Sequence, residues 1–173
     1  MLGRNAIGVD INSGAIAIAK KRLALGQDNN SRIEFRKGSA TNLDFIKDQS
    51  IDLVCMHPPY ANIIQYSENI SEDLSLFKYE EFLTEMRKVA KEAYRVLKNN
   101  KICAYMIGDI RKNGNVTPLG FKTMELFCKE GFILKEIIIK EQHNCRSSDY
   151  WKNKKKSFLL LAHEYIFVLK KER

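Results

Sequence analysis

Apolar residues in this chain gather in short runs that stop abruptly at polar or turn-forming residues. The clearest run covers residues 51–56, Ile-Asp-Leu-Val-Cys-Met, and is followed at once by His57, Pro58, Pro59 and Tyr60. A short segment rich in Ile, Leu and Val and bounded by breakers predicts a buried β-strand. Neither proline can donate a backbone hydrogen bond, so the strand must end there.

The other elements follow from the same patterns. Predicted strands cover residues 6–9 (ending at Asp10), 33–35, 102–107, 132–139 and 158–169. Predicted helices run from a cap at Asn12 or Ser13 to Gly26, over residues 79–98, and from Thr117 and Pro118 to Gly131. Alternation of strands and helices predicts an α/β fold with a mostly parallel sheet. The last two strands have no helix between them, so we expect an antiparallel pair at the sheet edge.

Length and composition exclude several classes of protein. With 173 residues and no linker-like segment, the chain predicts a single domain over residues 1–173. No apolar run is long enough to span a bilayer, and no signal-peptide pattern is present. The four cysteines lie far apart, without the spacing of metal ligands. We therefore expect a cytoplasmic protein with reduced thiols, no membrane association and no metal.

Charge points to a polyanionic partner. The formal net charge is +8, and much of the excess falls in one late loop beside Tyr150 and Trp151. Its cations are Arg146, Lys152, Lys154, Lys155 and Lys156. Cations interleaved with aromatic rings suit phosphate contacts and base stacking, so these residues are candidates for DNA binding. The alternative is a solvated connection between two strands.

Two strand ends carry candidate chemistry. After residues 51–56, the carbonyl groups of His57 and Pro58 remain able to accept hydrogen bonds, and Tyr60 offers a flat ring. Such a turn could bind a planar base that carries an amine, with the carbonyl groups accepting its hydrogen bonds and the ring stacking on it. The alternative is that the turn only terminates the strand. Asp10 stands at the tip of the first strand, where nucleotide-binding units place a carboxylate on ribose hydroxyls. A turn or helix-capping role for Asp10 is the alternative.

The chain resembles the DNA amino-methyltransferases, which transfer a methyl group from S-adenosylmethionine to adenine N6 or cytosine N4. The resemblance rests on residues 3–12 (GRNAIGVDIN), 19–23 (AKKRL) and 57–60 (HPPY), with support from residues 95–109 and the terminal strand pair. It implies a Rossmann-like methyltransferase sheet, mostly parallel, with a C-terminal antiparallel hairpin. It also implies S-adenosylmethionine as cofactor and DNA as partner.

The resemblance assigns expected roles to individual residues. Asp10 would hold the cofactor ribose, Ile11 would pack on its adenine, and Ser39 and Ala40 would line the adenine edge, where the family often has an acidic residue. The catalytic group would be His57, Pro58, Pro59 and Tyr60. His57 and the Pro58 carbonyl would accept hydrogen bonds from the target amine, which raises electron density on its nitrogen. Tyr60 would stack on a base flipped out of the duplex.

The chain departs from the family in two ways. His57 stands where the family usually has Asp, Asn or Ser, so the choice between adenine and cytosine stays open. The family's first strand and glycine-rich cofactor loop also have no counterpart ahead of Asp10. We therefore expect a gap between the Asp10 strand and the His57 strand, and weak cofactor binding by this chain alone. The domain would be incomplete: a truncation, a remnant, or part of a homodimer or split enzyme with a complementing chain.

Two rival functions remain open from the residues. Related families use Pro-Pro-Tyr for RNA or protein amide methylation. The chain could also be a non-catalytic fragment that completes the sheet of a partner subunit.

Overall fold

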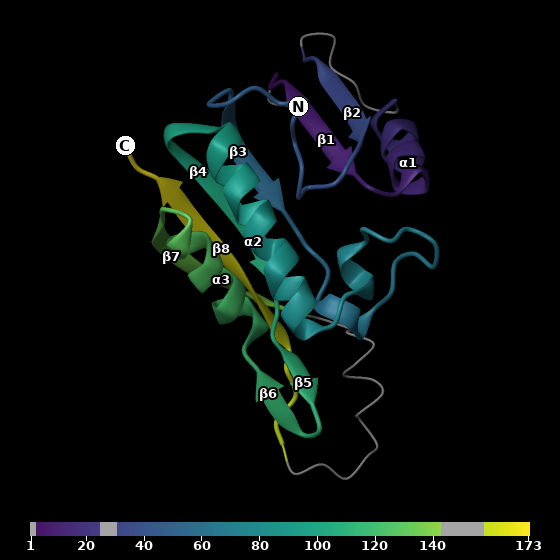
Figure 1. Cartoon of the computed structure of the whole chain (residues 1–173), viewed down its shortest axis with the longest axis vertical. Helices are drawn as coiled ribbons and strands as arrows, with labels where there is room; N and C mark the ends of the chain where they lie inside the picture. The colour runs from purple at the N-terminus through teal and green to yellow at the C-terminus, as the bar shows by residue number, and fades with distance from the viewer. Residues whose placement is uncertain (1–2, 25–30, 143–157) are drawn as a thin grey trace.

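The strands of the computed structural model form three separate sheets (Figure 1). The structure describes residues 3–24, 31–142 and 158–173. One sheet pairs β1 (Ala6–Asp10) with β2 (Ile33–Lys37) in parallel. The main sheet has the order β3 (Ile51–Met56), β4 (Leu97–Ile107), β8 (His163–Lys171) and β7 (Phe132–Glu141). A small hairpin joins β5 (Ile110–Lys112) to β6 (Asn115–Thr117).

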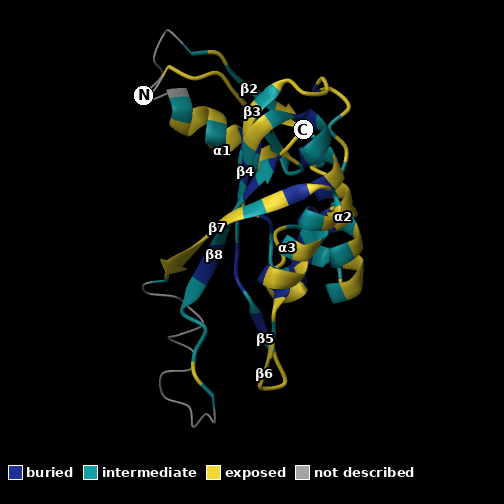
Figure 2. Ribbon diagram, turned by 90° about the vertical axis from the view of Figure 1, so that its left-hand side faces the viewer, coloured by how far each residue is buried: buried dark blue, intermediate teal, exposed yellow. Residues whose placement is uncertain are grey.

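The core lies between the main sheet and two helices. Helices α2 (Tyr79–Val96) and α3 (Leu119–Lys129) cover the same face of this sheet (Figure 2). In α2, apolar residues recur at helical spacing, and its buried residues include Phe82, Met86 and Val89. Tyr105 of β4 stacks on Phe127 of α3 with ring centroids 4.6 Å apart. Large rings that interdigitate in this way remove much apolar surface from water, and they hold the main sheet and its helices together.

Only the first pair of strands in the main sheet is parallel. β3 runs parallel to β4, whereas β8 is antiparallel to both β4 and β7. The predicted antiparallel pair is confirmed, and β7 is the edge strand while β8 lies inside the sheet. The expected α/β fold with a C-terminal antiparallel hairpin is therefore confirmed, but the main sheet is mixed rather than mostly parallel, because β8 lies between β4 and β7 and is antiparallel to both.

The β1–β2 pair carries its own helix and little core. Helix α1 (Ser13–Ala24) lies on the opposite side of the molecule from α2 and α3 (Figure 2). Ile16 is the one buried residue among the described residues between 3 and 40. Ile7 of β1 and Ile18 of α1 remain 44% and 56% exposed.

The expected gap lies between β1 and β3. Within the described residues, β1 pairs only with β2 and β3 only with β4, so both strands have an unpaired edge. The two strands point the same way in Figure 1. Leu53 of β3 and Ile133 of β7, on the sheet face away from α2 and α3, are about half exposed. Within the described residues, the main sheet thus has an unpaired edge at β3 and a solvent-exposed face on the side away from α2 and α3.

Two predicted boundaries were wrong for identifiable reasons. Helix α2 ends at Val96 rather than at Lys98, because Leu97 is fully buried and pairs with Ile51 as the first residue of β4. Pro118 is the N-cap of α3 rather than its first residue, because Thr117 belongs to β6. The predicted end at Gly131 is confirmed by its φ of +105°.

The hairpin β5–β6 was not predicted, although the sequence contains its signal. Asn113 and Gly114 join the two strands, and both have positive φ angles, 52° and 80°. An Asn-Gly pair with this backbone conformation is typical of the tight turns that connect β-hairpins. The last predicted strand was also too long, since β8 begins at His163 rather than at residue 158.

Candidate active site

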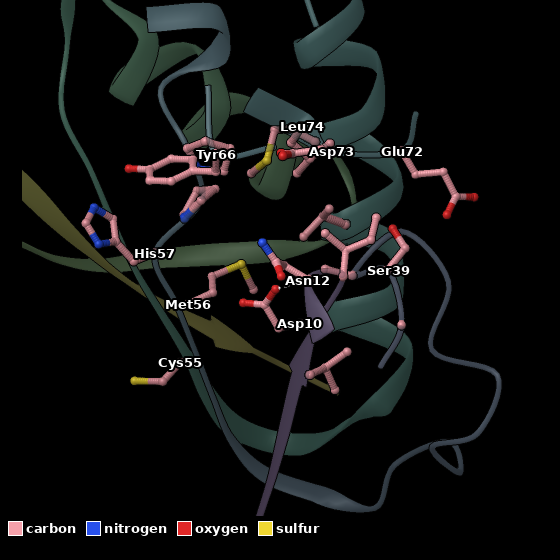
Figure 3. A pocket seen from close by; sticks show the side chains of 18 residues that line it. Asp10, Asn12, Ser39, Cys55, Met56, His57, Tyr66, Glu72, Asp73 and Leu74 are labelled. Carbon is pink, nitrogen blue, oxygen red and sulfur yellow. Dashed lines mark hydrogen bonds between the residues drawn. The ribbon is translucent and has the colours of Figure 1, made fainter. Parts of the chain in front are cut away.

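A cleft lies at the carboxyl ends of β1, β2 and β3, beside the gap in the sheet (Figure 3). Its volume is about 550 Å³, within the roughly 300–1,000 Å³ typical of small-molecule sites. Its lining residues are Val9, Asp10, Ile11, Asn12, Gly38, Ser39, Ala40, Cys55, Met56, His57, Pro58, Pro59, Tyr66, Glu72, Asp73, Leu74, Met86 and Val89. All four predicted cofactor residues therefore share one cleft with three of the four predicted catalytic residues.

Asp10 has a local structural role and also faces the cleft. Its Oδ1 accepts a hydrogen bond from the backbone N–H of Asn12 at 2.7 Å. The Asn12 side chain in turn accepts from the N–H of Gly14 at 2.8 Å and so caps α1. The carboxylate of Asp10 points into the cleft in Figure 3. The turn role and a ligand-binding role for Asp10 are therefore compatible, because a carboxylate has two oxygens.

Ser39 and Ala40 form the cleft wall that follows β2. The hydroxyl groups of Ser39 and Thr41 lie 2.7 Å apart, and the Ser39 hydroxyl also accepts from the N–H of Thr41 at 3.3 Å. These bonds fix the turn after Gly38. The wall is therefore built from small, locally bonded residues without a carboxylate.

The long loop after β3 supplies the opposite wall. Two short 3₁₀ turns, η1 (Ala61–Ile63) and η2 (Leu74–Leu76), bracket it, and Tyr66, Glu72 and Leu74 line the cleft. Asp73 is 6% exposed and accepts hydrogen bonds from the Ser67 hydroxyl at 2.6 Å and the Ser75 N–H at 2.8 Å. Burial opposes ionisation of Asp73, but these bonds outweigh it and lower its pKa.

The charge inside the cleft is opposite to that of the chain. Asp10, Glu72 and Asp73 line it, and none of its lining residues is Lys or Arg, although the chain as a whole carries +8. A set of carboxylates favours a cationic ligand and repels phosphate. The interior of the cleft is therefore unsuited to a polyanion but suited to a small cation.

Tyr60 does not line the cleft, unlike its three neighbours. Its ring packs against Gly108 at the end of β4, where an added Cβ would lie 3.3 Å from Tyr60 Cε2. Its hydroxyl donates a hydrogen bond to Glu164 of β8. Burial and the neighbouring Glu164 carboxylate raise the pKa of Tyr60 far above its usual value, so it keeps its proton.

Glu164 is a site residue that the sequence reasoning missed. It is 4% exposed, and its second oxygen binds the ammonium group of Lys140 from β7. His57 Nε2 lies 3.3 Å from the Tyr60 hydroxyl and 3.6 Å from Glu164 Oε1. The sequence signal was weak, because β8 carries polar residues at both ends, His163 and Glu164 at its start and Lys170 and Lys171 at its end.

Other predicted features lie outside these contacts. The candidate DNA-binding residues Arg146, Lys152, Lys154, Lys155 and Lys156 fall outside the described residues. In the part of the chain that the structure describes, no group of three or more His, Cys, Asp or Glu side chains could hold a metal ion. None of the described helices is both long enough and apolar enough to cross a membrane.

The fold is that of the Rossmann-like methyltransferases. A SAM-dependent methyltransferase from Methanosarcina mazei, 16% identical, matches 98% of this chain and 83% of its own with a TM-score of 0.64, which supports the fold alone. The chain matches the DNA methylase family model over residues 51–173 and a methyltransferase domain model over residues 1–60. Because the first match spans more than half of the chain, this chain belongs to the DNA methylase family.

Individual relatives agree with this family. The type II beta methyltransferase M.BslI of Bacillus sp. (strain NEB-606) is 29% identical over 143 residues, which cover 75% of this chain and 15% of that protein. The orphan methyltransferase M.BamHII of Bacillus amyloliquefaciens is 29% identical over 126 residues, 73% of this chain and 40% of that protein. The chain thus spans less than half the length of these relatives.

A solved structure adds a ligand to the comparison. A DNA modification methylase from Thermus thermophilus, complexed with S-adenosyl-L-methionine, is 26% identical with a TM-score of 0.57. The match covers 79% of this chain and 52% of that one.

Proposed function

We propose that this chain carries the target-base site and part of the cofactor site of a DNA amino-methyltransferase. The observation that supports this most directly is the shared cleft, which brings the Asp10 strand tip within one cavity of His57, Pro58 and Pro59. Adenine N6 and cytosine N4 are both compatible with a histidine at position 57.

The cleft fits S-adenosylmethionine in part. Asp10 would accept hydrogen bonds from the ribose hydroxyls, Ile11 would pack on the adenine ring, and Ser39 and Ala40 would border its edge. The three carboxylates of the cleft suit the sulfonium and ammonium cations of this cofactor. When bound, the cofactor would supply a methyl group that is activated by its sulfonium.

His57, Pro58, Pro59 and Tyr60 would hold the target base. The amine of adenine or cytosine is a poor nucleophile, because its lone pair is delocalised into the ring. Acceptors on its N–H bonds, at His57 and the Pro58 carbonyl, would raise the electron density on nitrogen. Tyr60 would stack on the flipped base from its position against Gly108.

DNA would contact the chain outside the cleft. The cleft repels phosphate, so we propose that the phosphate contacts come from Arg146, Lys152, Lys154, Lys155 and Lys156. Neutralising three of these lysines should weaken DNA binding and flatten its dependence on salt concentration. An unchanged salt dependence would reject this assignment.

A complementing strand would complete the cofactor site. Both unpaired edges, on β1 and β3, belong to parallel strands whose carboxyl ends reach the same cleft. A strand that enters parallel to both would satisfy their backbone groups and bring its own carboxyl end to the cleft. We propose that a complementing chain supplies this strand. A homodimer is the competing arrangement, and sedimentation analysis of the purified chain separates the two.

Titration of the isotope-labelled chain with S-adenosylmethionine, followed by NMR, tests the cofactor site. We expect weak binding that shifts the amide signals of residues lining the cleft, such as Ile11 and Ala40. Asp10→Asn should abolish these shifts, whereas Asp52→Asn, a matched change at an exposed carboxylate bound to Lys98 and Lys101, should preserve them. Absence of shifts in the unmodified chain would overturn the cofactor proposal. Micromolar affinity by calorimetry would overturn the expectation of weak binding.

A radiolabelled methyl transfer assay on DNA, tRNA and protein tests the substrate. Label in DNA supports the proposal, and label in tRNA or protein replaces it with an amide or RNA methyltransferase. Cofactor binding without transfer to any of the three, even with a complementing chain present, would favour the non-catalytic fragment.

A further inference from the structure

Glu164 joins the target-base site from a distant part of the chain. It enters from β8, 104 residues after Tyr60, and its side chain is almost fully buried. One oxygen accepts a hydrogen bond from the Tyr60 hydroxyl and lies 3.6 Å from His57 Nε2, while the other accepts a hydrogen bond from Lys140. The charged and titratable groups around His57 thus come from the loop after β3, from β8 and from β7.

The hydrogen bonds in this cluster fix the position of each proton. Burial opposes ionisation of Glu164, but its bonds from Lys140 and Tyr60 outweigh burial and lower its pKa. An ionised carboxylate can only accept, so the single proton of the Tyr60 hydroxyl points to Glu164. The Tyr60 oxygen can then only accept from His57, whose Nε2 lies 3.3 Å away. His57 must therefore carry its proton on Nε2.

We propose that Glu164 is a positioning residue that sets the tautomer of His57, so that Nδ1 carries the lone pair offered to the target amine. This inference rests on the proposed function of the site. In the other tautomer, Nδ1 of His57 would carry a hydrogen. This N–H would face the N–H bonds of the target amine, and Nδ1 could not accept a hydrogen bond from them. Glu164 would act through Tyr60 and His57 without touching the substrate.

The same arrangement provides a route for the proton released in the reaction. As the amine nitrogen bonds to the methyl carbon, the carbon–sulfur bond breaks and sulfur keeps the electron pair. The methylated amine then loses one proton, which His57 can take at Nδ1 before passing it to water. The resulting imidazolium has N–H groups on both nitrogens, and the Glu164 carboxylate near Nε2 would stabilise its charge.

The substitution Glu164→Gln should move the proton of His57 from Nε2 to Nδ1. Lys140 can only donate, so the amide introduced by Glu164→Gln should turn its oxygen to Lys140 and its NH₂ to Tyr60. The Tyr60 oxygen then accepts from the amide, and its own proton turns to His57 Nε2. His57 would consequently carry its proton on Nδ1.

Nitrogen-15 NMR of labelled histidine side chains tests this without any need for methyl transfer. The chain has three histidines, and His57→Gln identifies the signals of His57. We expect the Nε2–H tautomer at alkaline pH in the unmodified chain and the Nδ1–H tautomer in Glu164→Gln. Lys140→Met, which keeps the Glu164 carboxylate as the acceptor beside Tyr60, should leave the unmodified pattern in place.

The outcomes separate this inference from the proposed function. An Nδ1–H tautomer in the unmodified chain, or an unchanged tautomer in Glu164→Gln with intact amide spectra, would overturn the role of Glu164. A confirmed tautomer with no methyl transfer to DNA, even with a complementing chain present, would instead leave the geometry standing and reject the enzymatic assignment. If Glu164→Gln fails to fold, the Lys140→Met chain and the unmodified chain still report the resting tautomer.

Discussion

The two halves of the cleft rest on regions that differ in how they are held together. The His57 side stands on a four-stranded sheet covered by α2 and α3, with residues such as Tyr105, Phe167 and Leu169 fully buried. The Asp10 side stands on two strands and one helix, with Ile16 as the one buried residue among the described residues 3–40. The His57 side can therefore hold its geometry on its own core, whereas the Asp10 side has little core to hold it.

Truncating a large side chain should give the largest difference in the free energy of unfolding between the two regions. Phe167→Ala removes a fully buried ring that contacts Tyr105, Phe121 and Tyr165. We expect it to lower the free energy of unfolding by about 3–5 kcal/mol, the usual cost of such a cavity. Ile7→Ala, on the bare edge strand β1, should change the free energy by no more than about 0.5 kcal/mol. Urea denaturation followed by circular dichroism measures both, and similar losses would contradict the comparison.

Substituting alanine for one glycine in each region tests how much stability each region loses when a Cβ is added. An added Cβ at Gly120 of α3 would lie 2.8 Å from the buried Tyr165 ring, and one at Gly8 of β1 would lie 2.8 Å from the Phe35 ring. Tyr165 is also held by Asp109 and His163, so it has little room to move. We expect Gly120→Ala to cost about 1–3 kcal/mol. Gly8→Ala should cost less, because Phe35 is only partly covered and the alanine restricts the unfolded chain. The reverse order of thermal midpoints would show that β1 and β2 are the stiffer region.

The smallest expected effect is on the pH dependence of stability, through the carboxylate of Glu164. Burial opposes ionisation of Glu164, but its bonds from Lys140 and Tyr60 lower its folded pKa below the ordinary value of 4.5. The carboxylate therefore stabilises the fold above about pH 4.5, and this contribution is lost as pH falls through the lowered folded pKa. Glu164→Gln should be less stable than the unmodified chain at pH 7, and the difference should shrink toward pH 3. A constant difference across this range would show that Glu164 is not ionised at neutral pH.

Sequence reasoning succeeded where a local pattern decides the structure. The strand at residues 51–56 and the Asp10 strand tip follow from apolar runs that end at breakers. The family resemblance placed both strand ends in one site and predicted the gap between β1 and β3. Sequence reasoning failed where the deciding contact is distant. Leu97 leaves α2 because it pairs with Ile51, and Glu164 reaches Tyr60 across 104 residues. Neither of these two contacts can be read from a local sequence pattern. The carboxylates Glu72 and Asp73, which also line the cleft, lie in a loop without hydrophobic periodicity.

The internal position of β8 has a consequence for the order in which the protein folds. Among the described strands, β7 pairs with β8 alone, and β8 pairs with β4 across about 60 intervening residues. Closing so long a loop is slow, because its entropy is lost before the contacts form. We expect β7 to gain protection no earlier than β8 in a pulse-labelling hydrogen-exchange experiment. Protected β7 amides beside unprotected β8 amides would contradict this order. Glu164 lies on β8 as well, so its contacts with Tyr60 and His57 should be formed only in the last stage of folding.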